Sequence, residues 1–273
     1  MVLGGAACAA GWHGTGAVHF AAGKGRLADR VLLMRLRASA IAGSLLGLSM
    51  AAAISLGMRA ADDPFARFMA PLAAEPAGSS TTIVLDMGGI ADSPALMQWA
   101  SDAGKVCAEW YPLVCRFLAT DEWARPKEIV LVFRRGVGVP ALTGGNRMEF
   151  DAQWITDHPD DFGVVIHELT HVIQAYPAAA NKPGWLVEGI ADYIRLWKYE
   201  PEVPRPQIDR ATSKWTEGYR TTAAFLAWGC ARYDRRLVRV LDKALRSGTY
   251  SDEIWTQVTG KGLEELWAQF VRE

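Results

Sequence analysis

One segment, residues 164–174, constrains this chain more than any other, because it sets two histidines and a glutamate in an apolar run. Its sequence is VVIHELTHVIQ, an H-E-x-x-H pattern formed by His167, Glu168 and His171. Residues four apart on a helix share one face, so both imidazoles can point at one spot. The flanking Val, Leu and Ile residues predict a helix anchored in a core. The two aspartates at 160–161 are its predicted N-cap residues.

This arrangement supplies half of a catalytic zinc site. Zinc takes nitrogen ligands at ~2.0–2.1 Å in tetrahedral geometry, and His167 and His171 would fill two of the four positions. Glu168 follows the first histidine, so it would lie beside the metal and accept a proton from water whose pKa the zinc has lowered. Two other interpretations remain open at this point: hydrogen-bonded core histidines, or a purely structural zinc.

The segment GWLVEGIADYIR, residues 184–195, offers a third ligand. Glu188 follows His171 at a distance that allows a turn and a second helix packed across the first. Asp192 lies one turn further on the same face, where it would accept a hydrogen bond from the outer nitrogen of a ligand histidine and orient the ring. We choose Glu188 as the ligand because it comes first, has the longer side chain and precedes Gly189, which permits a close helix approach. The alternative is a solvated face, although the neighbouring residues are apolar.

Three blocks of sequence, HELTHVIQ, GWLVEGIADYIR and GYRTTAAFLAW, resemble in this order the plant and bacterial basic secretory protein family, regarded as zinc-dependent peptidases. The resemblance extends from about residue 81 to the C-terminus. It implies His167, His171 and Glu188 as zinc ligands and Glu168 as the catalytic residue. The E-x-x-x-D spacing is also similar to that of thermolysin-like gluzincins. The chain departs from the family name in not being basic, with a formal net charge of −1.

Two further predictions concern catalysis and substrate binding. Gluzincin-like sites place a Tyr or His donor where negative charge develops, and Tyr219 is the candidate here; the alternative is a tyrosine that only packs. Residues 146–152, NRMEFDA, alternate as in an edge strand, to which an extended peptide could add by main-chain hydrogen bonds. Asn146, Met148 and Phe150 are therefore predicted to bind substrate.

The N-terminal region is predicted to direct export. From Met34 the order is two arginines, an apolar run and small residues near Ala60, which is typical of a secretory signal. We predict an over-extended N-terminus at 1–33, a signal peptide at 34–60 and a linker at 61–80. A membrane anchor is the alternative for the apolar run. After signal cleavage we expect a secreted or periplasmic protein with no stable membrane association and, given its charge, no nucleic-acid partner.

The remaining residues, 81–273, are predicted to form a single zinc-peptidase-like catalytic domain. Strands are expected at 81–87 and 128–134 and a helix from Ser93 to about Leu118. These are followed by the metal-binding helix and then by helices only. This order predicts an α+β, zincin-like fold, with a small sheet packed on the metal-binding helix and an all-helical C-terminal half. The proline-containing loop at 199–217 is expected to lie over the site.

The predicted function is that of an exported zinc metallopeptidase, a hydrolase in which Glu168 assists the attack of zinc-bound water on a peptide bond. The expected cofactor is Zn²⁺ and the expected partner is a peptide or protein substrate. One alternative keeps the metal but acts on an amide or ester of the cell envelope. Another is a non-catalytic exported binding module in which zinc only joins two helices, although such a module has no use for Glu168.

Overall fold

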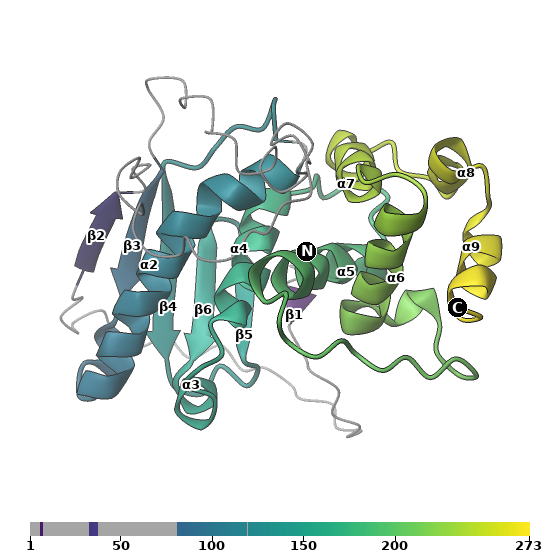
Figure 1. Cartoon of the computed structure of the whole chain (residues 1–273). Helices are drawn as coiled ribbons and strands as arrows, with labels where there is room; N and C mark the ends of the chain where they lie inside the picture. Colours follow the sequence, from purple (N-terminus) through teal and green to yellow (C-terminus); the bar gives the residue numbers. More distant parts are fainter. Residues whose placement is uncertain (1–5, 8–32, 38–80, 119) are drawn as a thin grey trace, which may run out of the picture.

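The computed structural model describes residues 6–7, 33–37, 81–118 and 120–273 (Figure 1). The N-terminal regions predicted as over-extended leader, signal peptide and linker lie outside the described residues, apart from the two short strands β1 (Ala6–Ala7) and β2 (Leu33–Arg37). Those predictions therefore stay predictions. Within the described residues, none of the helices combines the length and the apolar character that a membrane crossing requires.

A small mixed sheet lies in one half of the described structure. Its four main strands are β3 (Thr82–Asp86), β4 (Glu128–Arg134), β5 (Ala141–Gly144) and β6 (Arg147–Asp151). The strand order is β1-β5-β6-β4-β3-β2, with β3 and β6 parallel to β4 and the other pairs antiparallel. Alternate strand residues are fully buried on one face, which fixes the register. They include Ile83, Leu85, Ile129, Leu131, Phe133, Met148 and Phe150.

Two helices, α2 (Pro94–Phe117) and α4 (Gly163–Gln174), lie against the sheet (Figure 1). The start of α2 is set by Ser93, whose hydroxyl accepts a hydrogen bond from the amide of Leu96, and by a proline in the first turn. From α2, Trp99 packs edge-on against Phe133 and Phe150, which ties the helix to the sheet. A short helix, α3 (Ala152–Asp157), follows β6.

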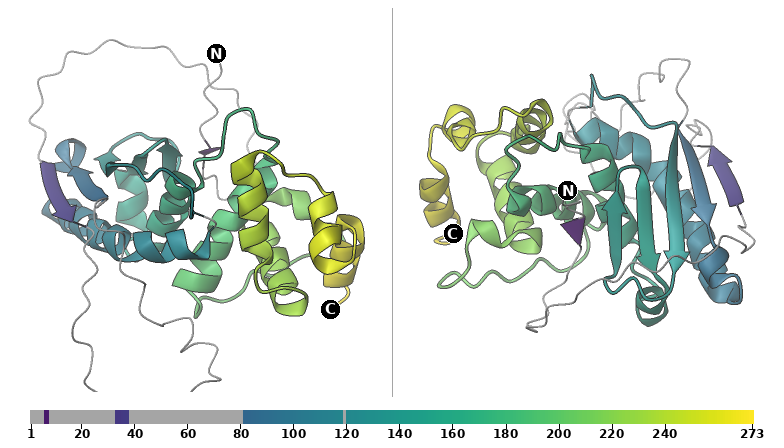
Figure 2. Two further views of the ribbon diagram at one scale, coloured as in Figure 1. Left: turned by 90° about the horizontal axis from the view of Figure 1, so that it is seen from above. Right: turned by 180° about the vertical axis from the view of Figure 1, so that it is seen from behind.

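The C-terminal half is helical and lies beside the sheet (Figure 2). Its helices are α5 (Gly184–Ile194), α6 (Tyr219–Arg232), α7 (Leu237–Ser247), α8 (Glu253–Thr259) and α9 (Leu263–Phe270). Short helical turns are η1 (Gly88–Ile90), the π-helical η2 (Arg195–Tyr199) that continues α5, and η3 (Trp215–Glu217). The described chain is thus α+β and mostly helical, as the sequence predicts.

The edge-strand prediction for residues 146–152 is wrong. The strand that forms there, β6, lies between β4 and β5 and pairs with both, so its backbone has no free edge for a peptide. The outer neighbour is β5, for which no strand was predicted. Met148 and Phe150 are fully buried in the core, and the side-chain amide of Asn146 donates to the carbonyl of Glu128. The free strand edge on which these three residues were predicted to bind substrate is therefore absent from β6.

Two smaller expectations also change. The middle of the proline-containing loop, residues 206–210, lines a hollow together with α6 and α9, whereas only Glu217 of this loop lines the cleft described below. Gly189 does permit a close helix approach, but the partner is α6. A Cβ on Gly189 would overlap the side chain of Thr222, which is fully buried on α6.

We predict that Gly189→Ala destabilises the protein by about 1–3 kcal/mol, because the added methyl forces α5 and α6 apart. Gly184→Ala on the same helix is the matched control, since a Cβ there meets nothing within 4 Å. Thermal unfolding measures both variants. A lower Tm for Gly189→Ala alone is expected, and equal Tm values would show that this contact does not limit the packing.

Candidate active site

Two imidazole side chains and one carboxylate converge between α4 and α5. The Nε2 atoms of His167 and His171 are 3.0 Å apart, and Oε2 of Glu188 lies 3.2 Å from the first and 3.3 Å from the second. Both histidines come from α4, one turn apart on its inner face, and Glu188 comes from α5. The cluster is nearly enclosed, with side-chain exposures of 0%, 7% and 11% in this order.

The outer nitrogen of each imidazole faces an oxygen acceptor. Nδ1 of His167 is 2.7 Å from Oδ1 of Asp192, and Nδ1 of His171 is 2.8 Å from Oε1 of Gln174. The Gln174 amide is oriented by its other end, which donates to the carbonyl of Val187 at 2.9 Å. Each Nδ1 therefore carries the hydrogen, and each Nε2 presents a lone pair to the cluster.

This donor set fits a metal ion. Two Nε2 lone pairs and one carboxylate oxygen meet with no hydrogen to share among them, so they repel one another unless a cation, or a proton on one ring, lies between them. Ligand atoms of a tetrahedral ion with bonds of ~2.0–2.1 Å lie roughly 3.3 Å apart, close to the spacing found here. Among the described residues, His167, His171 and Glu188 form a group that could hold a metal ion.

Glu188 supplies the negative charge of the cluster. Burial by itself would raise the pKa of this carboxyl, but in the metal-free site the imidazoles of His167 and His171, when protonated toward Oε2, outweigh burial and lower the pKa to about 2. The carboxylate is therefore ionised at neutral pH and ready to meet a cation.

Glu168 lies beside the cluster and is fully buried. One carboxylate oxygen, Oε2, accepts a hydrogen bond of 2.7 Å from the hydroxyl of Thr143 on β5. The other oxygen, Oε1, is buried without a hydrogen-bond partner in the described part of the chain. A buried carboxylate oxygen without a donor is costly, and such exceptions are concentrated at sites where a water, an ion or a substrate completes the hydrogen bonding.

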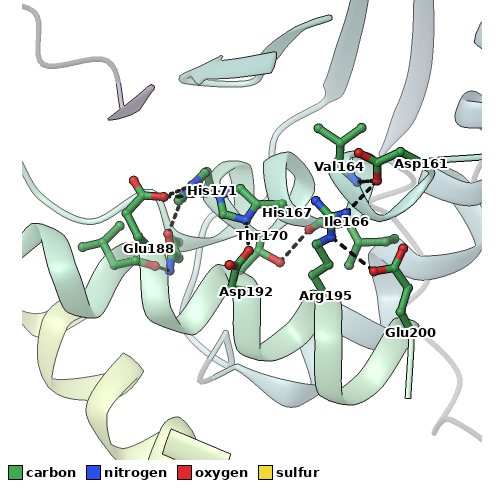
Figure 3. A network of polar contacts seen from close by, with 12 residues as sticks. Asp161, Val164, Ile166, His167, Thr170, His171, Glu188, Asp192, Arg195 and Glu200 are labelled. Atoms are coloured by element: carbon green, nitrogen blue, oxygen red, sulfur yellow. Dashed lines mark hydrogen bonds and ion pairs between the residues drawn. The ribbon is translucent and has the colours of Figure 1, made fainter. Parts of the chain in front are cut away.

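Arg195, at the end of α5, anchors the start of the histidine-bearing helix (Figure 3). Its guanidinium donates to Asp161 at 2.7 Å and to Glu200 at 3.2 Å. Burial opposes the charge, but these two carboxylates and Asp192 outweigh it and raise the pKa of Arg195. Asp161 also accepts a hydrogen bond from the amide of Val164 in the first turn of α4. This resembles the predicted N-cap role, although the helix begins at Gly163 and Phe162 occupies the N-cap position.

An open cleft of about 1150 Å³ lies next to the residues that surround His167. Two of its lining residues, Asp192 and Tyr219, flank the ring of His167. Asp192 accepts from its Nδ1, and the Tyr219 ring lies nearly parallel to it, with centroids 6.3 Å apart and planes at 15°. Tyr219 has a φ of +44°, one of two positive values at non-glycine residues in the described chain, directly after Gly218 at +79°. Such strained backbone is concentrated at functional sites.

The structure brings together six of the predicted site residues. His167, His171, Glu188 and Asp192 form one contiguous group, Glu168 follows His167 on α4, and Tyr219 lies at the edge of the group. Asn146, Met148 and Phe150 do not belong to it. Gln174 and Thr143, which also contact site residues, were not predicted from the sequence. A polar residue one turn after His171 in an apolar helix could have indicated Gln174, whereas no local pattern marks Thr143.

Comparison with known proteins agrees with this geometry and defines the class as a peptidase. A family model described as peptidase of plants and bacteria, the BSP family, matches residues 96–270. The chain therefore belongs to this family, and the resemblance found in the sequence is confirmed. Comparisons with curated proteins and with solved structures gave no match.

We predict different losses for the two carboxylates on α5. Glu188→Ala removes one of the three converging atoms and should largely abolish the retention of zinc. Asp192→Ala removes only the acceptor for His167 Nδ1, so the affinity for zinc should fall ~10–100-fold while the site still loads. Zinc content after dialysis against competing chelators measures both. The reverse order of losses would assign the metal to Asp192.

Proposed function

We propose that this chain is an exported zinc-dependent metallopeptidase of zincin-like fold. The observation that carries the proposal is the convergence of three lone-pair donors from His167, His171 and Glu188 beside a buried glutamate with one unpartnered oxygen. Two histidines and a glutamate are a donor set used by catalytic zinc sites, which keep the fourth position open for water or substrate. Zinc bound there would acidify a water molecule and polarise the carbonyl of the substrate.

The chain itself supplies the proton transfers. Glu168 Oε1 is free to accept a proton from the attacking water and to return it to the leaving amine, which makes Glu168 a general base and then a general acid. Asp192 and Gln174 hold the two imidazoles with Nε2 facing inward, so the metal ligands need no rearrangement before metal binding.

Tyr219 is our candidate for stabilising the charge that develops on the carbonyl oxygen. It lines the cleft and lies over the His167 ring, and its strained backbone fixes its position at the start of α6. A phenol donor aimed at a developing oxyanion stabilises the transition state more than the bound substrate.

The substrate class and the location follow from other features. The family name supports a peptide or protein substrate, which the open cleft can admit in extended form. The zincin-like description is supported by the packing of the histidine-bearing α4 on the sheet. A secreted or periplasmic location rests on the charge and apolar order of residues 34–60. Expression from Met34 in a bacterial host, followed by determination of where the product lies and of its first residue, tests the location.

We predict that Glu168→Gln keeps zinc bound but lowers turnover by ~10²–10⁴-fold, because the amide retains the shape of the side chain and cannot accept the proton. The assay is cleavage of a mixed peptide library by protein beginning at residue 61, with metal content measured in parallel. Full activity in zinc-loaded Glu168→Gln would reject this mechanism. No cleavage by zinc-loaded wild-type protein would reject the peptide substrate.

We also predict that Tyr219→Phe lowers kcat with little change in zinc content or KM, because it removes only the phenolic donor and keeps the ring over His167. Steady-state kinetics on a peptide that the wild-type protein cleaves measure the effect. Unchanged kinetics would mean that Tyr219 only packs.

A further inference from the structure

Strand β5 contributes one polar side chain that contacts Glu168. Thr143 is its third residue, and its side chain is largely buried at 9% exposure, facing α4. Its hydroxyl lies 2.7 Å from Oε2 of Glu168 and 3.2 Å from the backbone carbonyl oxygen of the same residue. Both of the acceptors that are near this hydroxyl thus belong to Glu168.

A single hydroxyl hydrogen is available for these two acceptors. The shorter distance favours the carboxylate oxygen, because 2.7 Å is a usual length for an O–H···O hydrogen bond and 3.2 Å is longer than usual. Oε2 is therefore the oxygen that Thr143 holds. The carbonyl of Glu168 lies within helix α4, where it belongs to the helical backbone.

Anchoring one oxygen decides what the other can do. A free glutamate side chain has several rotamers, and ordering it is entropically unfavourable. With Oε2 held by a residue of the sheet, the carboxylate is fixed relative to α4 and only Oε1 remains without a donor. A proton can then be accepted at one atom, from one direction.

We propose that Thr143 is a positioning residue that holds the carboxylate of Glu168 in its reactive orientation. The effect of Thr143 on catalysis rests on the proposed function of Glu168 as the acid–base group. Thr143 itself touches neither the metal-binding atoms nor the cleft. The hydroxyl acts through Glu168, and the strand that carries it belongs to the outer part of the sheet.

The test compares Thr143→Val, which removes the hydroxyl and keeps the β-branched shape suited to a strand, with Thr143→Ser, which keeps the hydroxyl. Thr120→Val is the matched control, because Thr120 is similarly buried and its hydroxyl donates to the carbonyl of Cys115, away from the site. For zinc-loaded Thr143→Val we expect kcat to fall about 10–100-fold, the range for a misplaced catalytic group, with KM and zinc content unchanged. Thr143→Ser should recover most of the rate, and Thr120→Val should match the wild type.

A merely structural role is distinguished by combining variants. In the Glu168→Gln background, Thr143→Val should cause little further loss, because the group it positions no longer accepts a proton. An equal fall in both backgrounds, or an unchanged kcat in Thr143→Val, would overturn the proposal.

The crystal structures of zinc-loaded Thr143→Val and Thr143→Ser separate this inference from the proposed function. If the wild-type protein cleaves no peptide, the proposed function fails, but displacement of the Glu168 carboxylate in the Val variant and not in the Ser variant would still support positioning. An unmoved carboxylate in both variants would overturn it whatever the activity.

Discussion

The site depends on three atoms whose lone pairs repel one another and which the fold nevertheless holds 3.0–3.3 Å apart. They are Nε2 of His167, Nε2 of His171 and Oε2 of Glu188. Such a cluster does not form by itself, because each acceptor would be better solvated by water. It persists because α4 and α5 are each buried along an apolar face, and because the outer nitrogens of both imidazoles are already bonded to Asp192 and Gln174. The rings cannot turn away without losing those bonds. The preference for a cation is therefore built into the packing of the two helices.

The histidine-bearing helix is held at both ends by arginines from elsewhere in the chain. At its start, Arg195 pairs with Asp161, which accepts the amide of the first helical turn. At its end, Arg246 of α7 donates to the carbonyls of Ile173 and Gln174, which the helix itself leaves unpaired. The ends of the Arg195 and Glu200 side chains pack directly against the backbone of Gly163, where a Cβ would overlap them. The helical half of the described chain thus contributes to fixing the position of α4 at both of its ends.

Glu168, the proposed acid–base group, and its surroundings come from three separate parts of the chain. Glu168 belongs to α4, its hydroxyl partner Thr143 to β5, and Tyr219 to the start of α6. This distribution means that the reactive geometry exists only when sheet, histidine-bearing helix and helical half are assembled. The positive φ angles at Gly218 and Tyr219 indicate strain that the surrounding packing sustains, which is a common property of residues that must point in one direction.

Local spacing determined much of this site. The i, i+4 relation of His167 and His171, and of Glu188 and Asp192, follows from the pitch of a helix, so the sequence alone placed each pair on one face. The α+β order and the start of α2 at Ser93 were equally local. Tertiary structure alone decided that residues 147–151 form an inner strand, that Gly189 admits α6, and that Thr143 meets Glu168. The alternation of side chains indicates which face of a strand is buried. The number of strands that hydrogen-bond to its backbone depends on segments that are distant in the sequence, so a local pattern does not predict it.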